Sequence, residues 1–221
     1  MSDGEAARGW IADEVAAEFG ELRLWYTEIT APAPKTTPAL KARLRDLSSR
    51  FNGGQAVALR TKPIPNAYRV FFRHIGLDPD VERVPVEQLV VRRLTQGGFL
   101  PTTLLEDAVT IAVMETSVGI WALDAGTVAP PFGVRAAVEH EPLGRRDERA
   151  PWLPSGRLCV ADAEGPVAVL FGDVAPGHQV TRETTSAYLF AVQVAGVPAI
   201  HVSEALWTVE DIVAGADQIG S

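Results

Sequence analysis

The sequence has a single cysteine, no long apolar run and a deficit of positive charge. Cys159 cannot form a disulfide within the chain, and no cysteine pair has the spacing of a zinc site. The longest apolar segments, such as 166–172 and 190–192, have the length of a strand, well short of the ~18 residues that a membrane helix needs. We therefore expect no structural metal and no membrane span.

Acidic residues outnumber basic ones by 28 to 20, and the formal net charge is −8. An acidic protein binds duplex nucleic acid poorly without sequence specificity, because such binding depends on neutralisation of phosphates by Lys and Arg. A nucleic acid held by a local basic face is still compatible with this charge. Residues 1–8 lack the basic start and apolar stretch of a secretory signal, so a cytoplasmic location is expected.

The length and composition are those of one globular domain. Of the 221 residues, 47% are hydrophobic and 22% are charged. We expect a single domain over 1–221, with a loose tail over 1–9, an N-terminal extension over 10–60 and a core over 61–214.

The hydrophobic spacing predicts helices in the first half of the chain and strands in the second. The N-terminal extension is expected to be a helix, a strand and a helix, over 10–19, 22–29 and 38–51, the last capped by Thr37 and ended by Gly53 and Gly54. Further helices are expected over 67–75, 85–96 and 103–115; Leu94 of the second should face inward, and the third should be largely buried. Strands are expected near 118–123, 133–138, 157–161, 166–171 and 187–194, before a final helix over 204–214 that Ser203 caps. This order favours an α+β fold over a doubly wound sheet.

The common catalytic motifs are missing. The sequence contains no GxSxG nucleophile elbow, no HExxH zinc motif, no GxxxxGK[ST] phosphate loop and no GxGxxG fingerprint. No cofactor is therefore predicted.

Several single residues allow a structural and a functional interpretation. His74 is expected at the surface, and Cys159 is expected to be a buried, inert thiol in a strand. His178 lies in a loop, where it is either a turn residue or a ligand contact. Asp107, in the most apolar helix, and Asp124 each carry a carboxylate that needs a partner, for which Arg135 is a candidate, or that contacts a ligand amine.

Two clusters carry the same ambiguity. Hydroxyl residues before the last strand either satisfy turns or contact a ligand; they are Thr181, Thr184, Thr185 and Ser186. Basic residues on neighbouring elements form either a solvated surface or a phosphate-binding face; they are Arg60, Lys62, Arg69, Arg73, Arg92 and Arg93.

An ordered set of segments is similar to a known family. The segments on which this similarity is based are IPNAYRVFFRHIGLDP at 64–79, RVPVEQLVVRR at 83–93, FLPTTLLED at 99–107, WALD at 121–124, GVRAA at 133–137, SGRLCVAD at 155–162 and TTSAYLF at 184–190. Together they resemble the editing and tRNA-binding module of the phenylalanyl-tRNA synthetase beta subunit, and in particular the stand-alone proteins built on that module. The resemblance covers nearly the whole chain.

The resemblance implies a layered α/β sandwich with a central cavity that takes an aminoacyl group. In the synthetase, that cavity hydrolyses the ester that joins a wrong amino acid to tRNA. The chemistry would use a positioned water, with backbone donors and hydroxyls near the developing oxyanion. The implied partners are tRNA or a related aminoacyl ligand, with no metal; the oligomeric state is left open.

The sequence departs from the family's pattern at four places. Trp121 stands where the synthetase has a histidine, Thr110 replaces an asparagine, Gly172-Asp173 replaces a pair of glycines, and Phe190 replaces a glutamate that contacts the amino-acid side chain. The predicted pocket is therefore more apolar, and tyrosine-specific editing is not expected.

The resemblance implies roles for residues at matching positions. The expected catalytic residues are Thr184, Thr185 and Asp107. The expected ligand contacts are Thr110, Trp121, Asp124, His178 and Phe190. The expected tRNA contacts are Arg69, Arg73, Arg92 and Arg93. Two alternatives stay open at this stage: a non-catalytic tRNA-binding module, or a small-molecule enzyme on the same scaffold.

Overall fold

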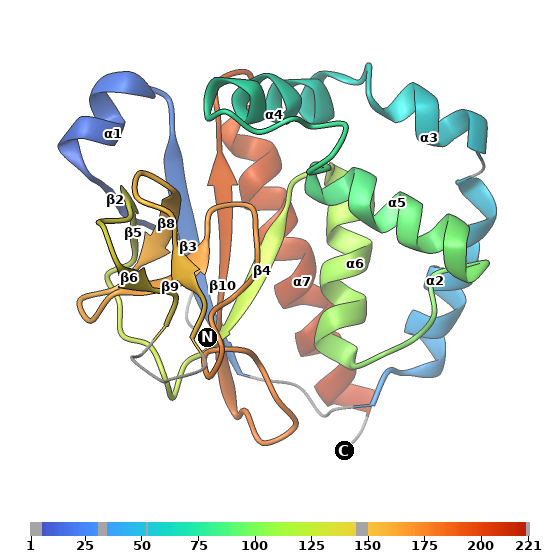
Figure 1. Cartoon of the computed structure of the whole chain (residues 1–221). Helices are drawn as coiled ribbons and strands as arrows, with labels where there is room; N and C mark the ends of the chain where they lie inside the picture. The colour runs from blue at the N-terminus through green and yellow to red at the C-terminus, as the bar shows by residue number, and fades with distance from the viewer. Residues whose placement is uncertain (1–5, 31–34, 52, 145–149, 220–221) are drawn as a thin grey trace. The chain divides into compact units, whose positions relative to one another are not determined.

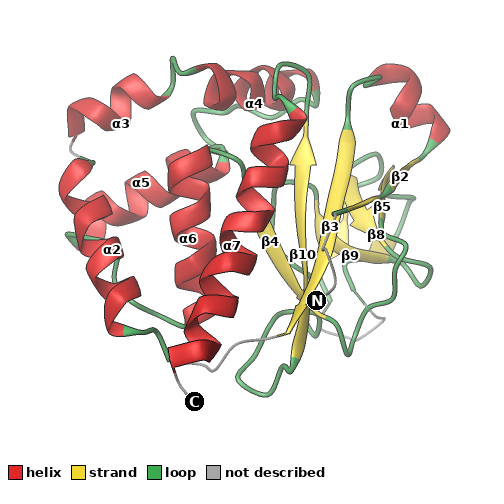
Figure 2. Cartoon of the chain, turned by 180° about the vertical axis from the view of Figure 1, so that it is seen from behind, coloured by secondary structure: helices red, strands yellow, loops and turns green. Residues whose placement is uncertain are grey.

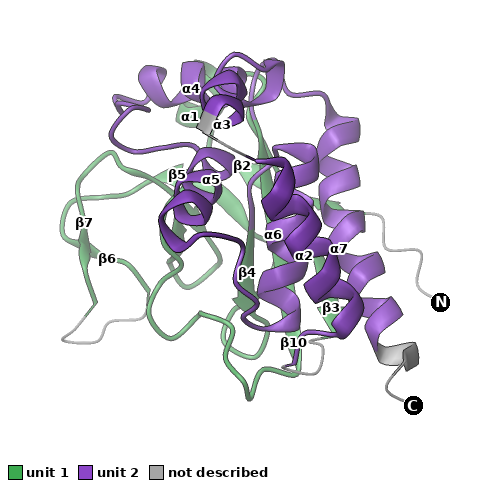
Figure 3. Cartoon of the chain, turned by 90° about the vertical axis from the view of Figure 1, so that its right-hand side faces the viewer, with its two compact units in different colours: residues 1–30, 121–193 green, residues 31–120, 194–221 purple. Residues whose placement is uncertain are grey.

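The computed structural model describes residues 6–30, 35–51, 53–144 and 150–219. The chain divides into two compact units, residues 1–30 with 121–193 and residues 31–120 with 194–221 (Figure 3). We call them unit 1 and unit 2. Unit 1 holds nearly all of the strands and unit 2 holds all of the longer helices (Figure 2). The predicted α+β class is confirmed.

Unit 1 contains two four-stranded sheets and a short hairpin. The first sheet has the order β1-β3-β10-β4, with bounds Ala7–Arg8, Arg23–Thr30, Ser186–Gln193 and Ile120–Asp124. The second has the order β2-β5-β8-β9, with bounds Trp10–Ile11, Gly133–Ala136, Leu158–Ala161 and Pro166–Val169. Strands β6 (Glu141–Pro142) and β7 (Trp152–Leu153) form the hairpin, and α1 covers Asp13–Glu18.

Strands β3 and β10 form the main ladder of unit 1 (Figure 1). They pair antiparallel over all eight residues, from Ser186 opposite Thr30 to Gln193 opposite Arg23. Directly opposed residues point to the same face of a sheet. Tyr26, Tyr188 and Phe190 therefore share one face, and Phe132, directly before β5, contacts the first two with ring centroids 5.0 and 5.1 Å away. This aromatic layer joins the two sheets.

Unit 2 is built around α6, Leu104–Thr116, and α7, Ala199–Ile219, which pack against each other. The other helices are α2 (Pro38–Arg50), α3 (Gly53–Leu59), α4 (Pro63–His74) and α5 (Pro85–Gln96). Leu40, Leu44 and Leu47 form the buried face of α2, which contacts α6. Burial of such a side chain contributes about 1.5–3 kcal/mol, so packing rather than helix propensity holds these helices.

The helix ends follow local chemistry. The hydroxyl of Thr37 accepts from the backbone N–H of Leu40 at 3.2 Å, and that of Thr103 accepts from Glu106 at the same distance. Helix α5 ends at Gly97, whose φ of 78° is in the left-handed region. The predicted helix over 103–115 and its burial are confirmed.

The chain start differs from the prediction. The sequence predicts a loose tail over 1–9, yet Ala7 and Arg8 pair with β3; residues 1–5 lie outside the described residues. Trp10, predicted in a helix, instead belongs to β2, opposite Gly133. A Cβ added at Gly133 would lie 1.9 Å from the Trp10 ring, so this contact between distant residues overrides the helical spacing. The strand predicted in the N-terminal extension, β3, belongs to the same sheet as β10 of the predicted core.

Three smaller predictions are also wrong. Gly53 and Gly54 do not end a helix but begin α3. The last helix begins at Ala199, so Ser203 lies inside it and does not cap it. Leu94, predicted to face inward, is 40% exposed.

Candidate functional site

The predicted site residues divide between the two units. Unit 1 holds six of them: Trp121, Asp124, His178, Thr184, Thr185 and Phe190. Unit 2 holds the other six: Arg69, Arg73, Arg92, Arg93, Asp107 and Thr110.

An aromatic cluster in unit 1 forms around Trp121. Its indole stacks on Phe190, with centroids 5.4 Å apart and an interplanar angle of 11°, and meets Phe171 edge-on at 5.8 Å. The indole N–H donates to the carbonyl of Gly172 at 2.9 Å. Trp121 is half-buried, whereas Phe190 is fully buried. The structure thus brings together two predicted ligand contacts, on β4 and β10.

Phe171 is a member of this cluster that the sequence pattern does not reveal. Its φ of 61° lies in the left-handed region, which is unfavourable for a bulky side chain. The strained backbone directs a buried ring onto Trp121. No pattern in the sequence announces a positive φ at phenylalanine, so only the structure could find it.

A polar cluster forms around Asp124 at the end of β4. The hydroxyl of Thr184 donates to Oδ2 of Asp124 at 2.6 Å, and the backbone N–H of Gly126 donates to Oδ1 at 2.9 Å. The N–H of Asp124 itself donates to the carbonyl of His178 at 2.9 Å. Three predicted residues, Asp124, His178 and Thr184, are therefore in direct contact.

The imidazole of His178 is buried beside Thr127. Nδ1 lies 3.0 Å from Oγ1 of Thr127, and that hydroxyl is also 2.9 Å from the carbonyl of Asp124, to which it can donate. Thr127 therefore links the imidazole of His178 to the backbone of Asp124.

The other hydroxyls before β10 have different surroundings. Thr184 also accepts from the backbone N–H of Thr181 at 3.0 Å, as a turn residue does. Ser186 donates to Oε1 of Glu28 at 2.7 Å. Thr185 is exposed. The turn interpretation of this cluster therefore fits Thr184, whereas Ser186 bonds across the ladder to β3.

Glu28 also affects Tyr188, which lies opposite it in the ladder. Burial, together with a hydrogen bond to Glu28 and the negative charge of that residue, raises the pKa of Tyr188 above its ordinary value. The phenol therefore stays protonated and acts as a donor at neutral pH.

Asp107 is buried at the start of α6 with partners other than the predicted arginine. Its carboxylate accepts from the hydroxyl of Thr36 and from the backbone N–H and hydroxyl of Thr102, the last two at 3.0 Å. Arg135 instead pairs with Glu141, with nitrogen–oxygen distances of 2.5 and 2.8 Å, so its predicted pairing with Asp107 is wrong. These bonds favour the structural interpretation of Asp107. Thr110 is buried further along the same helix.

The predicted tRNA-contacting arginines fall into two classes. Arg69 is 6% exposed and pairs with Glu87 at 3.0 Å and with Asp80 at 2.8 Å, so it is removed from the predicted basic face. Arg93 donates to the carbonyl of Ser48 at 2.7 and 3.1 Å. Arg73 and Arg92 are exposed.

The remaining predictions for single residues can be checked directly. His74 is exposed, as expected. Cys159 is buried in β8, and this burial raises the pKa of its thiol to about 11, which suppresses the reactive thiolate. Over the described residues, no group of histidine, cysteine or carboxylate side chains has the arrangement of a metal site. None of the described helices is long and apolar enough to cross a membrane.

Comparison with known proteins shows which family this chain is related to. No family model matches the chain. The phenylalanine–tRNA ligase beta subunit of Xanthomonas campestris pv. campestris is 32% identical over 190 residues, which are 85% of this chain and 21% of that protein. The chain is homologous to a segment of the phenylalanine–tRNA ligase beta subunit. The resemblance found in the sequence is thereby confirmed.

Other beta subunits match a shorter part of the chain. Those of Xylella fastidiosa and Xanthomonas oryzae pv. oryzae are 32% and 33% identical over 120 and 116 residues, or 52% of this chain. An N-terminal fragment of the beta subunit from Pyrococcus horikoshii superimposes with a TM-score of 0.42 at 17% identity, over 53% of this chain and 42% of that one. The chain spans between 14% and 21% of the length of these curated beta subunits.

Proposed function

We propose that this beta-subunit homologue binds tRNA, with the aminoacyl end of the tRNA held by unit 1. The observation that carries the proposal is the alignment with a phenylalanine–tRNA ligase beta subunit over 85% of the chain. Because the chain corresponds to a fifth of that protein, the proposal concerns ligand binding and does not extend to aminoacylation.

The distribution of charge supports a tRNA-binding face on unit 2. Residues 35–93 contain 12 of the 20 Lys and Arg residues but only 5 of the 28 acidic residues. The acidic net charge of the chain therefore resides elsewhere. Exposed Arg73 and Arg92 belong to this basic segment and can neutralise phosphates, whereas Arg69 is already neutralised by Glu87.

The Trp121 cluster suits an apolar aminoacyl side chain. Tryptophan and phenylalanine rings offer a large apolar surface, and the half-buried Trp121 is the most accessible of the three aromatic residues. The substitution of Phe190 for the family's glutamate removes a polar recognition group from this surface. We therefore expect a preference for an apolar amino acid over tyrosine.

Binding can be tested with fluorescently labelled tRNA over a series of salt concentrations. We expect measurable affinity that falls with salt, and a log–log slope that decreases by about 1 for each phosphate-contacting arginine that is removed. Arg73→Gln and Arg92→Gln are the test variants. Arg182→Gln, an exposed arginine of unit 1, is the matched control. Affinity that does not change with salt, or no binding, contradicts the proposal.

A second candidate function is hydrolysis of the aminoacyl ester. The arrangement around Asp124 favours it: the carboxylate accepts from the hydroxyl of Thr184, and Thr127 links the imidazole of His178 to the backbone of Asp124, so a carboxylate, a hydroxyl and an imidazole on neighbouring elements are available to position and deprotonate a water. The water would attack the ester carbonyl, and the ribose oxygen would leave with a proton. No covalent intermediate is needed.

Hydrolysis is tested by incubating the protein with a panel of mischarged tRNAs. If the polar cluster is catalytic, Asp124→Asn and His178→Gln lower the rate by about 10²-fold or more, while Thr185→Val has a smaller effect because Thr185 is exposed. Background rates with every tRNA, combined with salt-dependent binding, would leave the chain as a non-catalytic binding protein.

A further inference from the structure

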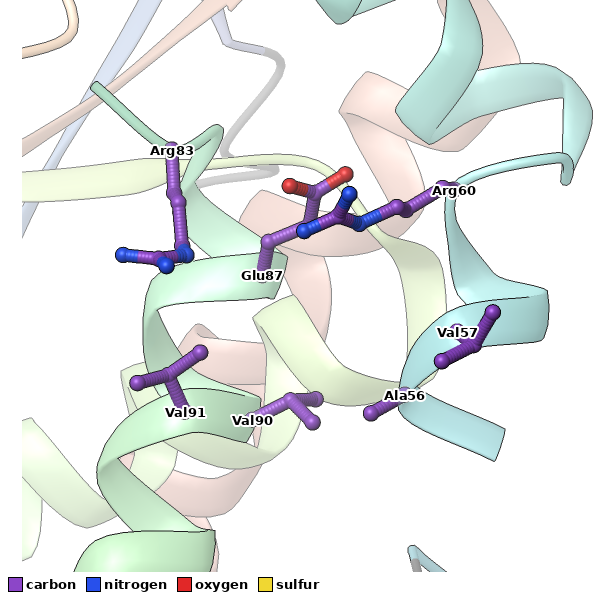
Figure 4. A pocket seen from close by; sticks show the side chains of 7 residues that line it. All are labelled: Ala56, Val57, Arg60, Arg83, Glu87, Val90 and Val91. Atoms are coloured by element: carbon purple, nitrogen blue, oxygen red, sulfur yellow. The ribbon is translucent and has the colours of Figure 1, made fainter. Parts of the chain in front are cut away.

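A pocket lies within unit 2, between α3 and α5 (Figure 4). Its volume is about 210 Å³, and most of its lining is aliphatic, from Ala56, Val57, Val90 and Val91. Val57 is 70% exposed, so no described part of the chain covers this side of the pocket. The pocket lies within the basic segment 35–93 and shares Arg60 with the predicted basic face, but none of its lining residues is a predicted tRNA or aminoacyl contact.

The charged residues that line this pocket carry one net positive charge; they are Arg60, Arg83 and Glu87. Glu87 pairs with buried Arg69, while Asp80 is shared by Arg69 and Arg60 at 2.8 and 2.9 Å. Arg83 is the one charged residue of the lining that forms no ion pair with any described residue.

Arg83 also has an unsatisfied donor. Its Nε is buried, and no described residue accepts a hydrogen bond from it. A buried donor without an acceptor is unfavourable, because its hydrogen bond to water is lost on folding and is not replaced by one to the protein. In Figure 4 Arg83 and Val91 lie on one side of the pocket, with Arg60 and Val57 on the other side.

We infer that this pocket binds a small aliphatic monocarboxylate. Its carboxylate pairs with Arg83 through the planar guanidinium, and its alkyl chain lies on Val57, Val90 and Val91. One net positive charge in the lining calls for one negative charge, and a guanidinium matches a carboxylate in shape. The aliphatic lining disfavours a fully polar anion such as inorganic phosphate.

The test is calorimetric titration with isovalerate. Isovaleramide, which has the same shape without the charge, and inorganic phosphate, which has charge without the alkyl chain, are the ligand controls. We expect isovalerate to bind at least about tenfold more tightly than either control. Equal binding of the amide, or displacement of isovalerate by phosphate at the same concentration, overturns the inference.

The variant Arg83→Met keeps an unbranched side chain and removes the charge. It should weaken isovalerate binding by about tenfold or more. Arg45→Met changes an exposed arginine of α2 that does not line the pocket, and it should bind isovalerate as the wild type does. Wild-type affinity in Arg83→Met disproves the assignment.

Two further measurements distinguish a bound carboxylate from a structural role of Arg83 and from a second copy of the chain. Since Arg83→Met removes an unsatisfied donor, its melting temperature without acid should equal or exceed that of the wild type; a lower value would mean that Arg83 has a structural partner, against the inference. Sedimentation should show no self-association that depends on this pocket. A dimer that Val57→Asp dissociates would mean that a second copy covers the valines, and the inference would fall.

Discussion

The indole of Trp121 lies almost parallel to the ring of Phe190, at a centroid distance of 5.4 Å. This contact joins adjacent strands β4 and β10 of one sheet and is supported by the hydrogen bond from Trp121 to Gly172. A stacked pair of this kind contributes ~0.5–1.5 kcal/mol beyond the area that it buries. It is therefore a structural element of unit 1 as well as the proposed aminoacyl surface.

The first prediction concerns this pair. Trp121→Ala removes the stacking, the packing against Phe171 and the indole hydrogen bond, so we expect a loss of about 3 kcal/mol in the free energy of unfolding. Urea denaturation followed by circular dichroism measures it. Trp207→Ala is the matched control, because Trp207 is 62% exposed and its removal should change stability by less than ~0.5 kcal/mol. Equal losses in the two variants would refute the structural role.

The second prediction concerns the buried pair of Arg69 and Glu87. Their side chains are 7% and 4% exposed, so Glu87→Ala leaves a buried guanidinium partly uncompensated. We expect a cost of about 3–5 kcal/mol. Glu115→Ala breaks the exposed pair with Arg43, whose side chain is 41% exposed, and should cost less than ~1 kcal/mol. Chemical denaturation of the two variants distinguishes these values, and a similar small loss in both would show that burial adds nothing.

The third prediction concerns Asp107. Asp107→Ala leaves the hydroxyl of Thr36 and the N–H of Thr102 without their acceptor, which we expect to cost about 2–3 kcal/mol. Glu106→Ala, at the neighbouring exposed position, should be nearly neutral. If Asp107 instead served only a ligand, its replacement would lower activity or binding and leave the thermal denaturation midpoint unchanged.

The fourth prediction is a pH dependence. The hydrogen bond and positive charge of Arg135, together with the backbone N–H of Val138, hold the pKa of Glu141 below its ordinary value of 4.5. A carboxyl with a lowered folded-state pKa stabilises the fold above its unfolded pKa and loses that contribution as the pH falls through the folded value. Stability should therefore decrease below about pH 4.5, as Glu141 becomes protonated.

Denaturation at a series of pH values checks this effect. In Glu141→Gln, the decrease in stability between about pH 5 and pH 3 should be smaller than in the wild type, because the titrating group is gone. Glu139→Gln is the control, since the Glu139 side chain is 80% exposed and belongs to the same loop. Parallel curves for Glu141→Gln and the wild type would assign the acid sensitivity to other groups.

Local sequence determined most of the secondary structure. Hydroxyl caps at Thr37 and Thr103 and the glycine stop at Gly97 use groups within a few residues, so their effect can be read from the sequence. The same is true of strands such as β10, whose residues have strong strand preference. Trp10 is an exception because its position depends on Gly133, more than a hundred residues away.

The sequence also determined the relationship to the beta subunit, because it aligns with that protein over 85% of the chain. It placed Trp121, Phe190, Asp124, His178 and Thr184 among the candidates, and the fold brings the first two together and the last three together. Only the tertiary structure decided the partners of the charges. Arg69 pairs with Glu87, and Asp107 accepts hydrogen bonds from Thr36 and Thr102 instead of pairing with Arg135. Arg83 has no described partner for its Nε. Such pairing depends on which distant side chains the fold brings within hydrogen-bonding distance.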